Sequence, residues 1–104
     1  MQTEREFRWI PFVKWHELLE RAQLENVRLT PIKRARRLMY ATSGATGRVA
    51  YTVDEFGCSC PAGRNGVDCK HRALYLFTHF ARLTAAYGYP TEMVESGAVG
   101  EEYG

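Results

Sequence analysis

The chain has 104 residues, of which 45% are hydrophobic and 25% are charged, and its formal net charge is +2. This length suffices for one compact domain and is too short for two, which excludes a multidomain enzyme. A domain of this size buries only about two-thirds of the surface that its unfolded chain exposes. Hydrophobic burial therefore leaves a thin stability margin, to which a bound metal would add substantially.

The first predicted element is an amphipathic helix from Phe12 to about Glu25. Pro11 directly ahead of it suits the first helical turn, where the missing N–H costs nothing. We interpret Trp9 and Trp15 as core or interface residues rather than ligand contacts. The helix prediction depends on apolar residues that recur at spacings of three and four, namely Phe12, Trp15, Leu18, Leu19 and Ala22.

The next segment predicts a β-hairpin, because residues 38–42 and 49–53 each alternate along the chain and turn-forming residues separate them. Ahead of the hairpin, Thr30 and Pro31 have two interpretations. They either begin a second helix, with Thr30 as the N-cap, or simply interrupt the regular secondary structure. The sequence therefore does not distinguish a helix from a strand for residues 31–37.

The strongest helical pattern begins at Cys69 and predicts one long helix, which Gly88 and Pro90 are placed to end. His16 and His79 fall within the two predicted helices, where histidines are more often surface or core residues than ligands. We leave both out of the site. The apolar stripe of the second helix consists of Ala73, Leu76, Phe77, Phe80, Ala81 and Thr84.

The charges are unevenly distributed along the chain. All 14 Lys and Arg residues lie at or before Arg82, whereas four of the 12 acidic residues follow Pro90. Residues 1–91 therefore carry 14 basic and eight acidic residues, a net charge of +6, and the last 13 residues carry −4. Because the C-terminal segment also lacks a sustained apolar period, we expect residues 90–104 to form an acidic, disordered tail.

The chain contains three cysteines, an odd number that cannot form a fully paired set of disulfides. Its N-terminal segment lacks the basic head, apolar stretch and small-residue cleavage site of a secretion signal. We therefore expect a cytoplasmic protein in a reducing compartment. The longest purely apolar run, residues 73–77, has five residues against the roughly 18 that a membrane-spanning helix needs, so we expect no transmembrane segment.

The cysteines and one histidine form a C-x-C…C-x-H pattern, in which eight residues separate Cys60 from Cys69. Three thiolates and one imidazole are a complete tetrahedral ligand set for Zn²⁺. Cys58 and Cys60 would point to the same side of an extended strand, and Cys69 and His71 would bind from the start of the long helix. With four protein ligands no position is left for a catalytic water, so we predict one structural Zn²⁺.

Three other interpretations of these residues compete with zinc binding. The cysteines could be buried without any ligand. A cysteine could form a catalytic pair with His71 or His79, but the sequence offers no third residue to orient the pair. A disulfide between Cys58 and Cys60 would close a small, strained ring and is disfavoured in a reducing compartment. Since the sequence also offers no acid pair, open metal site or cofactor loop, we expect no enzymatic activity.

From Cys58 to Leu74 the sequence resembles the SWIM zinc finger, a C-x-C-x(n)-C-x-H module of two strands and a helix. The resemblance covers about residues 36–85, including the hairpin ahead of the first cysteine. It implies that Pro61 makes the turn after the first ligand pair and that Lys70 lies between the last two ligands. The four ligands that it implies are Cys58, Cys60, Cys69 and His71.

The resulting expectation is a small α+β domain with an N-terminal helix, a β-hairpin, a zinc knuckle and a long C-terminal helix. We expect residues 1–30 to form an N-terminal helical extension and residues 31–89 to form the SWIM domain. The acidic tail at residues 90–104 completes the chain.

SWIM modules bind DNA or contact other proteins, and the resemblance does not choose between them. We expect nucleic-acid binding, with DNA favoured over RNA, because basic residues cluster ahead of the finger and near it. Some of these residues could instead only neutralise the metal site, whose three thiolates and Zn²⁺ sum to −1. The candidate contacts to phosphates are Arg28, Lys33, Arg34, Arg36, Arg37, Arg48, Arg64, Lys70 and Arg72.

The alternative function is a protein-interaction adaptor, including a homodimer. It would use part of the wide apolar face of the long helix, or an aromatic N-terminal segment. That segment contains Phe7, Trp9, Phe12 and Trp15.

Overall fold

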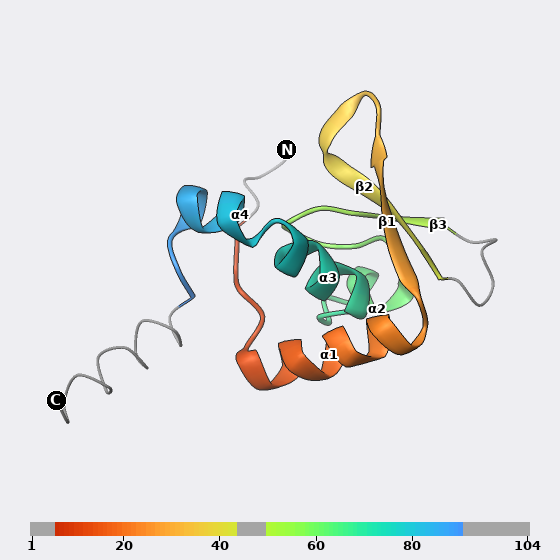
Figure 1. The fold of residues 1–104 in the computed structure, drawn as a ribbon, viewed down its shortest axis with the longest axis horizontal. Coiled ribbons are helices and arrows are strands. Elements are labelled where there is room, and N and C mark those ends of the chain that lie inside the picture. The colour runs from red at the N-terminus through yellow and green to blue at the C-terminus, as the bar shows by residue number, and fades with distance from the viewer. Residues whose placement is uncertain (1–5, 44–49, 91–104) are drawn as a thin grey trace, which may run out of the picture.

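The computed structural model describes residues 6–43 and 50–90 and has the expected α+β architecture (Figure 1). Along the sequence, one helix precedes a three-stranded antiparallel sheet and three helices follow it. The strand order within the sheet is β1-β2-β3. The elements are α1 (Phe12–Leu24), β1 (Val27–Ile32), β2 (Ala35–Ser43), β3 (Ala50–Val53), α2 (Pro61–Arg64), α3 (Lys70–Thr78) and α4 (Phe80–Tyr87).

The prediction of the first helix is confirmed. Pro11 is its N-cap residue rather than its first helical residue, and Trp15, Leu18 and Ala22 are buried. The Trp15 indole Nε1 donates a 2.9 Å hydrogen bond to the carbonyl of Ala73, which ties α1 to α3. The apolar residues therefore bury one face of α1 against the rest of the domain, as their spacing predicts.

The predicted hairpin is present as β2 and β3, in which Ala41 pairs with Tyr51 and Met39 with Val53. Most of the expected turn at residues 43–47 lies outside the described residues. The helix that Thr30 and Pro31 could have capped is absent from this segment, because both belong to strand β1. Proline is tolerated there because β1 is an edge strand, where a missing N–H interrupts no ladder on the outer side.

The expected single long helix is wrong: it is divided into α3 and α4, and His79 between them has φ −108° and ψ 26°. Tertiary contacts account for the break. The His79 Nε2 lies 3.2 Å from the sulfur of Met39 in β2. At the far end of α4, the Trp9 indole donates to the carbonyl of Gly88. These contacts hold α4 in its place after the break, and Gly88 ends it as predicted.

One core joins the three strands and the helices of the described chain except α2, which buries no residue. The boundary expected at residue 30 falls inside β1, and of the tail expected at residues 90–104 only Pro90, which is buried, lies within the described residues. None of the described helices combines the length and the apolar character that crossing a bilayer requires. The core consists of Ile10, Trp15, Leu18, Ala41, Val53, Ala73, Tyr75, Leu76 and Leu83.

Candidate metal centre

The structure brings the four predicted ligands together. One ligand atom from each of Cys58, Cys60, Cys69 and His71 lies within 4.8 Å of the others. The His71 Nδ1 is 3.5 Å from the Cys58 sulfur and 3.9 Å from the Cys69 sulfur. Tetrahedral zinc with ordinary Zn–S and Zn–N bonds would place its ligand atoms about 3.5–3.8 Å apart. The cluster therefore has the composition and the size of a structural metal site, and zinc is the metal that this donor set suits.

Three short local structures place the cysteines. Cys58 forms an isolated β-bridge with Val53, across a tight turn in which the Asp54 carboxylate accepts the N–H groups of Phe56 and Gly57. Cys60 is the N-cap of α2 and Cys69 is the N-cap of α3. The first ligand pair therefore follows β3 through a turn instead of extending the hairpin.

His71 and Pro61 lie in the first turns of α3 and α2. His71 lies in the first turn of α3, as the pattern predicted, and its ring lies 5.4 Å from the ring of Tyr51 in β3. Pro61 begins the one-turn helix α2, where its missing N–H leaves no helical bond unmade. The site thus links the end of the sheet to the start of α3.

Electrostatics in the cluster favour a thiolate at Cys69. The hydrogen bond from the Cys58 thiol lowers the pKa of Cys69 to about 4, and His71 and the backbone N–H of Arg72 act in the same direction. The same hydrogen bond, together with burial, raises the pKa of Cys58. The Cys60 sulfur accepts the N–H of Gly63 at 3.4 Å. Backbone N–H groups therefore point toward the sulfurs of Cys60 and Cys69, which favours thiolates and suits a bound cation.

The predicted phosphate contacts fall into different environments. Arg28, Lys33 and Arg34 are exposed on the β1–β2 hairpin, and none of them forms an ion pair with a described residue. Arg37 is exposed on the same hairpin but lies 3.5 Å from the Glu55 carboxylate. Arg48 and the side chain of Arg36 lie outside what the structure describes.

The remaining three predicted contacts lie near the metal cluster. Arg64 is exposed and donates to the carbonyl of Ser59 at 3.0 Å. Lys70 forms a 2.7 Å ion pair with Glu25, and this hydrogen bond lowers the pKa of the Glu25 carboxyl. These contacts direct both basic groups toward their own chain.

Arg72 must be removed from the predicted phosphate contacts, because only 6% of its surface is exposed. Its Nε donates to the carbonyl of Glu55 at 2.9 Å, and one terminal nitrogen donates to the carbonyl of Arg8. The other terminal nitrogen lies 3.7 Å from the Asp68 carboxylate. Desolvation lowers the pKa of this guanidinium. Arg72 therefore fastens the N-terminal segment and the turn after β3 to α3.

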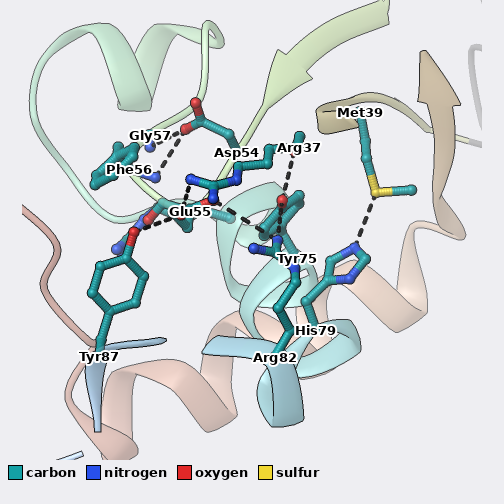
Figure 2. Close-up of polar contacts among 11 residues, drawn as sticks. Arg37, Met39, Asp54, Glu55, Phe56, Gly57, Tyr75, His79, Arg82 and Tyr87 are labelled. Atoms are coloured by element: carbon teal, nitrogen blue, oxygen red, sulfur yellow. Dashed lines mark hydrogen bonds and ion pairs between the residues drawn. The ribbon is translucent and has the colours of Figure 1, made fainter. Parts of the chain in front are cut away.

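Sequence reasoning missed the polar network that Figure 2 shows around Glu55. Glu55 is 1% exposed, accepts a 2.7 Å hydrogen bond from the Tyr87 hydroxyl, and lies 3.8 Å from Arg82. Arg82 in turn donates to the Tyr75 hydroxyl at 2.7 Å. Nothing in the local sequence marks Glu55, because it lies in a turn whose partners come from β2 and α4. The network connects α4 to the turn that precedes the first ligand.

A glycine inside the ligand loop provides a test of its packing. A Cβ on Gly63 would lie 2.0 Å from the carbonyl oxygen of Cys58, which backbone atoms cannot accommodate without moving. We expect Gly63→Ala to destabilise the domain by about 1–3 kcal/mol and to weaken metal retention. Chelator competition and urea unfolding would measure the two effects. The matched control is Gly57→Ala, because a Cβ on Gly57 has no atom within 4 Å. Equal behaviour of the two variants would contradict the prediction.

No protein-family model, curated protein or solved structure matches the chain.

Proposed function

We propose that this chain is a SWIM-like module in which one structural zinc stabilises the fold and the β1–β2 hairpin binds DNA. The observation that carries the DNA-binding part is charge on that hairpin. Residues 26–53 contain six basic residues and no acidic residue. Arg28, Lys33 and Arg34 are exposed there. Such a surface suits phosphate oxygens, which release counterions when basic groups neutralise them.

The metal has a structural role in this proposal. Cys58, Cys60, Cys69 and His71 would hold it, and four protein ligands leave no position for a reacting water. The C-x-C…C-x-H spacing and its setting between a hairpin and a helix support the SWIM assignment. A bound zinc would connect the turn after β3 to α3 and so fix the sheet, which includes the β1–β2 hairpin, relative to that helix.

The placement of the helices favours contacts with phosphates over the reading of base edges. Helix α3 buries His71, Arg72, Ala73, Tyr75 and Leu76, so it has little free surface to insert into a DNA groove. The β1–β2 turn, in contrast, extends away from the helices (Figure 1). We therefore expect binding with little sequence preference and with strong salt dependence.

Charge reversal at the tip of the hairpin tests DNA binding. We expect Lys33→Glu/Arg34→Glu to weaken binding to a fluorescein-labelled DNA at least about 10-fold at low salt. The loss of two phosphate contacts should reduce the slope of log K against log salt concentration by about 2. Fluorescence anisotropy at several salt concentrations measures both quantities.

The control variant is Lys14→Glu/Arg21→Glu, which makes the same charge change on the exposed side of α1. Zinc content and the thermal midpoint should match the wild type in both variants. If the control weakens binding as much as the hairpin variant, net charge alone accounts for the effect. If the wild type shows no salt-dependent binding at all, the proposal fails.

Protein docking is the second candidate, and one observation favours it. Phe77 is 61% exposed between two hollows of about 530 and 300 Å³, both lined by His16 and Leu19 of α1. The aromatic N-terminal segment is a poorer docking patch, because Phe7 stacks on Tyr87 and its other aromatic residues pack against the core. The helix face would therefore carry this function, and light scattering over a range of concentrations would detect a homodimer.

A further inference from the structure

The sheet has an outer face that differs from the face against the helices. Residues paired across antiparallel strands lie on the same face, and Thr30 pairs with Tyr40, which pairs with Thr52. The adjacent row consists of Arg28, Thr42 and Ala50. Neither row belongs to the core, to which the alternate residues Ala41 and Val53 contribute.

Tyr40 occupies the middle of this outer face. It lies on the central strand, its side chain is 43% exposed, and both of its cross-strand partners are threonines. Threonine side chains are shorter than a tyrosine ring and cannot cover it fully, which agrees with its partial exposure. Arg28 lies on the same face in the adjacent row, at the diagonal distance of about 7–8 Å that long side chains can bridge.

Tyr40 also differs from the other tyrosines in the described part of the chain. Tyr51 contacts the His71 ring, and Tyr89 contacts the ring of Phe80. The hydroxyls of Tyr75 and Tyr87 form hydrogen bonds. Among these five tyrosines, only Tyr40 has neither a ring contact nor a side-chain hydrogen bond with a described residue. Its ring is therefore free to stack on a ligand.

We propose that the outer sheet face binds single-stranded DNA, with a base stacked on Tyr40 and the phosphates on Arg28, Lys33 and Arg34. The inference rests on the proposed function and specifies its substrate. Charge complementarity identifies the ligand as a polyanion, since residues 26–53 carry no acidic residue. The unengaged ring identifies it as single-stranded, because the faces of unpaired bases are accessible to an aromatic side chain whereas those in a duplex are stacked on each other.

The experiment compares a labelled oligodeoxythymidine with a duplex of the same length by fluorescence anisotropy. The wild type should bind the single strand more tightly than the duplex. Because stacking on an aromatic side chain contributes about 1–3 kcal/mol per base, Tyr40→Ala should weaken single-strand binding roughly 5- to 150-fold. Duplex binding should hardly change, and Tyr40→Phe should retain wild-type affinity because it keeps the ring.

Tyr89→Ala is the matched control, because Tyr89 is 60% exposed but lies beyond α4. A second readout does not depend on affinity. Ultraviolet irradiation of a bromodeoxyuridine oligonucleotide bound to the wild-type protein should crosslink Tyr40, which mass spectrometry of the peptides identifies. Zinc content and thermal midpoint would verify that each variant is folded.

The possible failures are distinguishable. Equal single-strand binding by the wild type and Tyr40→Ala, or a crosslink that avoids β2, would overturn the stacking proposal. Tighter binding of the duplex would overturn it too and would leave the proposed DNA-binding function standing. Absence of binding to both DNAs would reject the proposed function itself.

Discussion

His71→Ala is expected to abolish zinc binding and to unfold the domain at room temperature. The imidazole is buried and lies 3.5 Å and 3.9 Å from two cysteine sulfurs, so its removal leaves the cluster with three ligands. A structural zinc site contributes about 10–16 kcal/mol of apparent free energy at neutral pH. A whole domain has a net stability of only about 5–15 kcal/mol. Loss of the metal is therefore sufficient to unfold a chain with so small a core.

Elemental analysis of zinc per chain and circular dichroism during heating would measure both effects. The matched control is His16→Ala, because His16 is an exposed histidine on α1 whose imidazole lies 3.4 Å from the Glu20 carboxylate, away from the cysteines. His71→Cys should restore metal binding, since four cysteines also form a structural zinc site. Undiminished zinc content and thermal stability in His71→Ala would refute the site.

Arg72→Ala has the second-largest expected effect, a loss of about 3–5 kcal/mol in the free energy of unfolding. Its guanidinium donates to the carbonyls of Glu55 and Arg8 and lies near Asp68. Truncation leaves these groups without their donor in a buried site, where unpaired polar groups are costly. Lysine should not rescue the loss, because an ammonium on a linear side chain cannot reproduce the planar fork of the guanidinium.

Urea unfolding measures this loss, with Arg28→Ala as the matched control. Arg28 is exposed and should change stability by no more than about 0.5 kcal/mol. DNA binding should respond in the opposite way, since Arg28 is a proposed contact and Arg72 is not. A folded, fully stable Arg72→Ala with weakened DNA binding would show that the guanidinium is available to phosphates.

Local patterns in the sequence predicted the elements whose cause is local. The three- and four-residue spacing of apolar residues predicted α1, and alternation predicted the hairpin of β2 and β3. Strand β1 was not predicted, because Thr30 and Pro31 are as typical of a helix start as of an edge strand. The pattern also could not show the break at His79, since the apolar spacing continues across it.

Residue type and spacing alone predicted the four candidate metal ligands. Two short C-x-C and C-x-H pairs joined by a loop of turn formers can meet at one ion in few ways, and the structure places their ligand atoms together. The exposure of the basic residues, in contrast, does not follow from residue type. Arg28 and Arg72 are the same residue type, yet one is exposed on an edge strand and the other is buried among distant carbonyls.

Only the tertiary structure decided which basic residues are free, that Glu55 is buried against α4, and that Tyr40 stands on an open sheet face. The burial of Glu55, for example, involves a partner 32 residues away along the chain, Tyr87. A short sequence window records the periodicity and the spacing of its own residues. It cannot record which distant surface will pack against them.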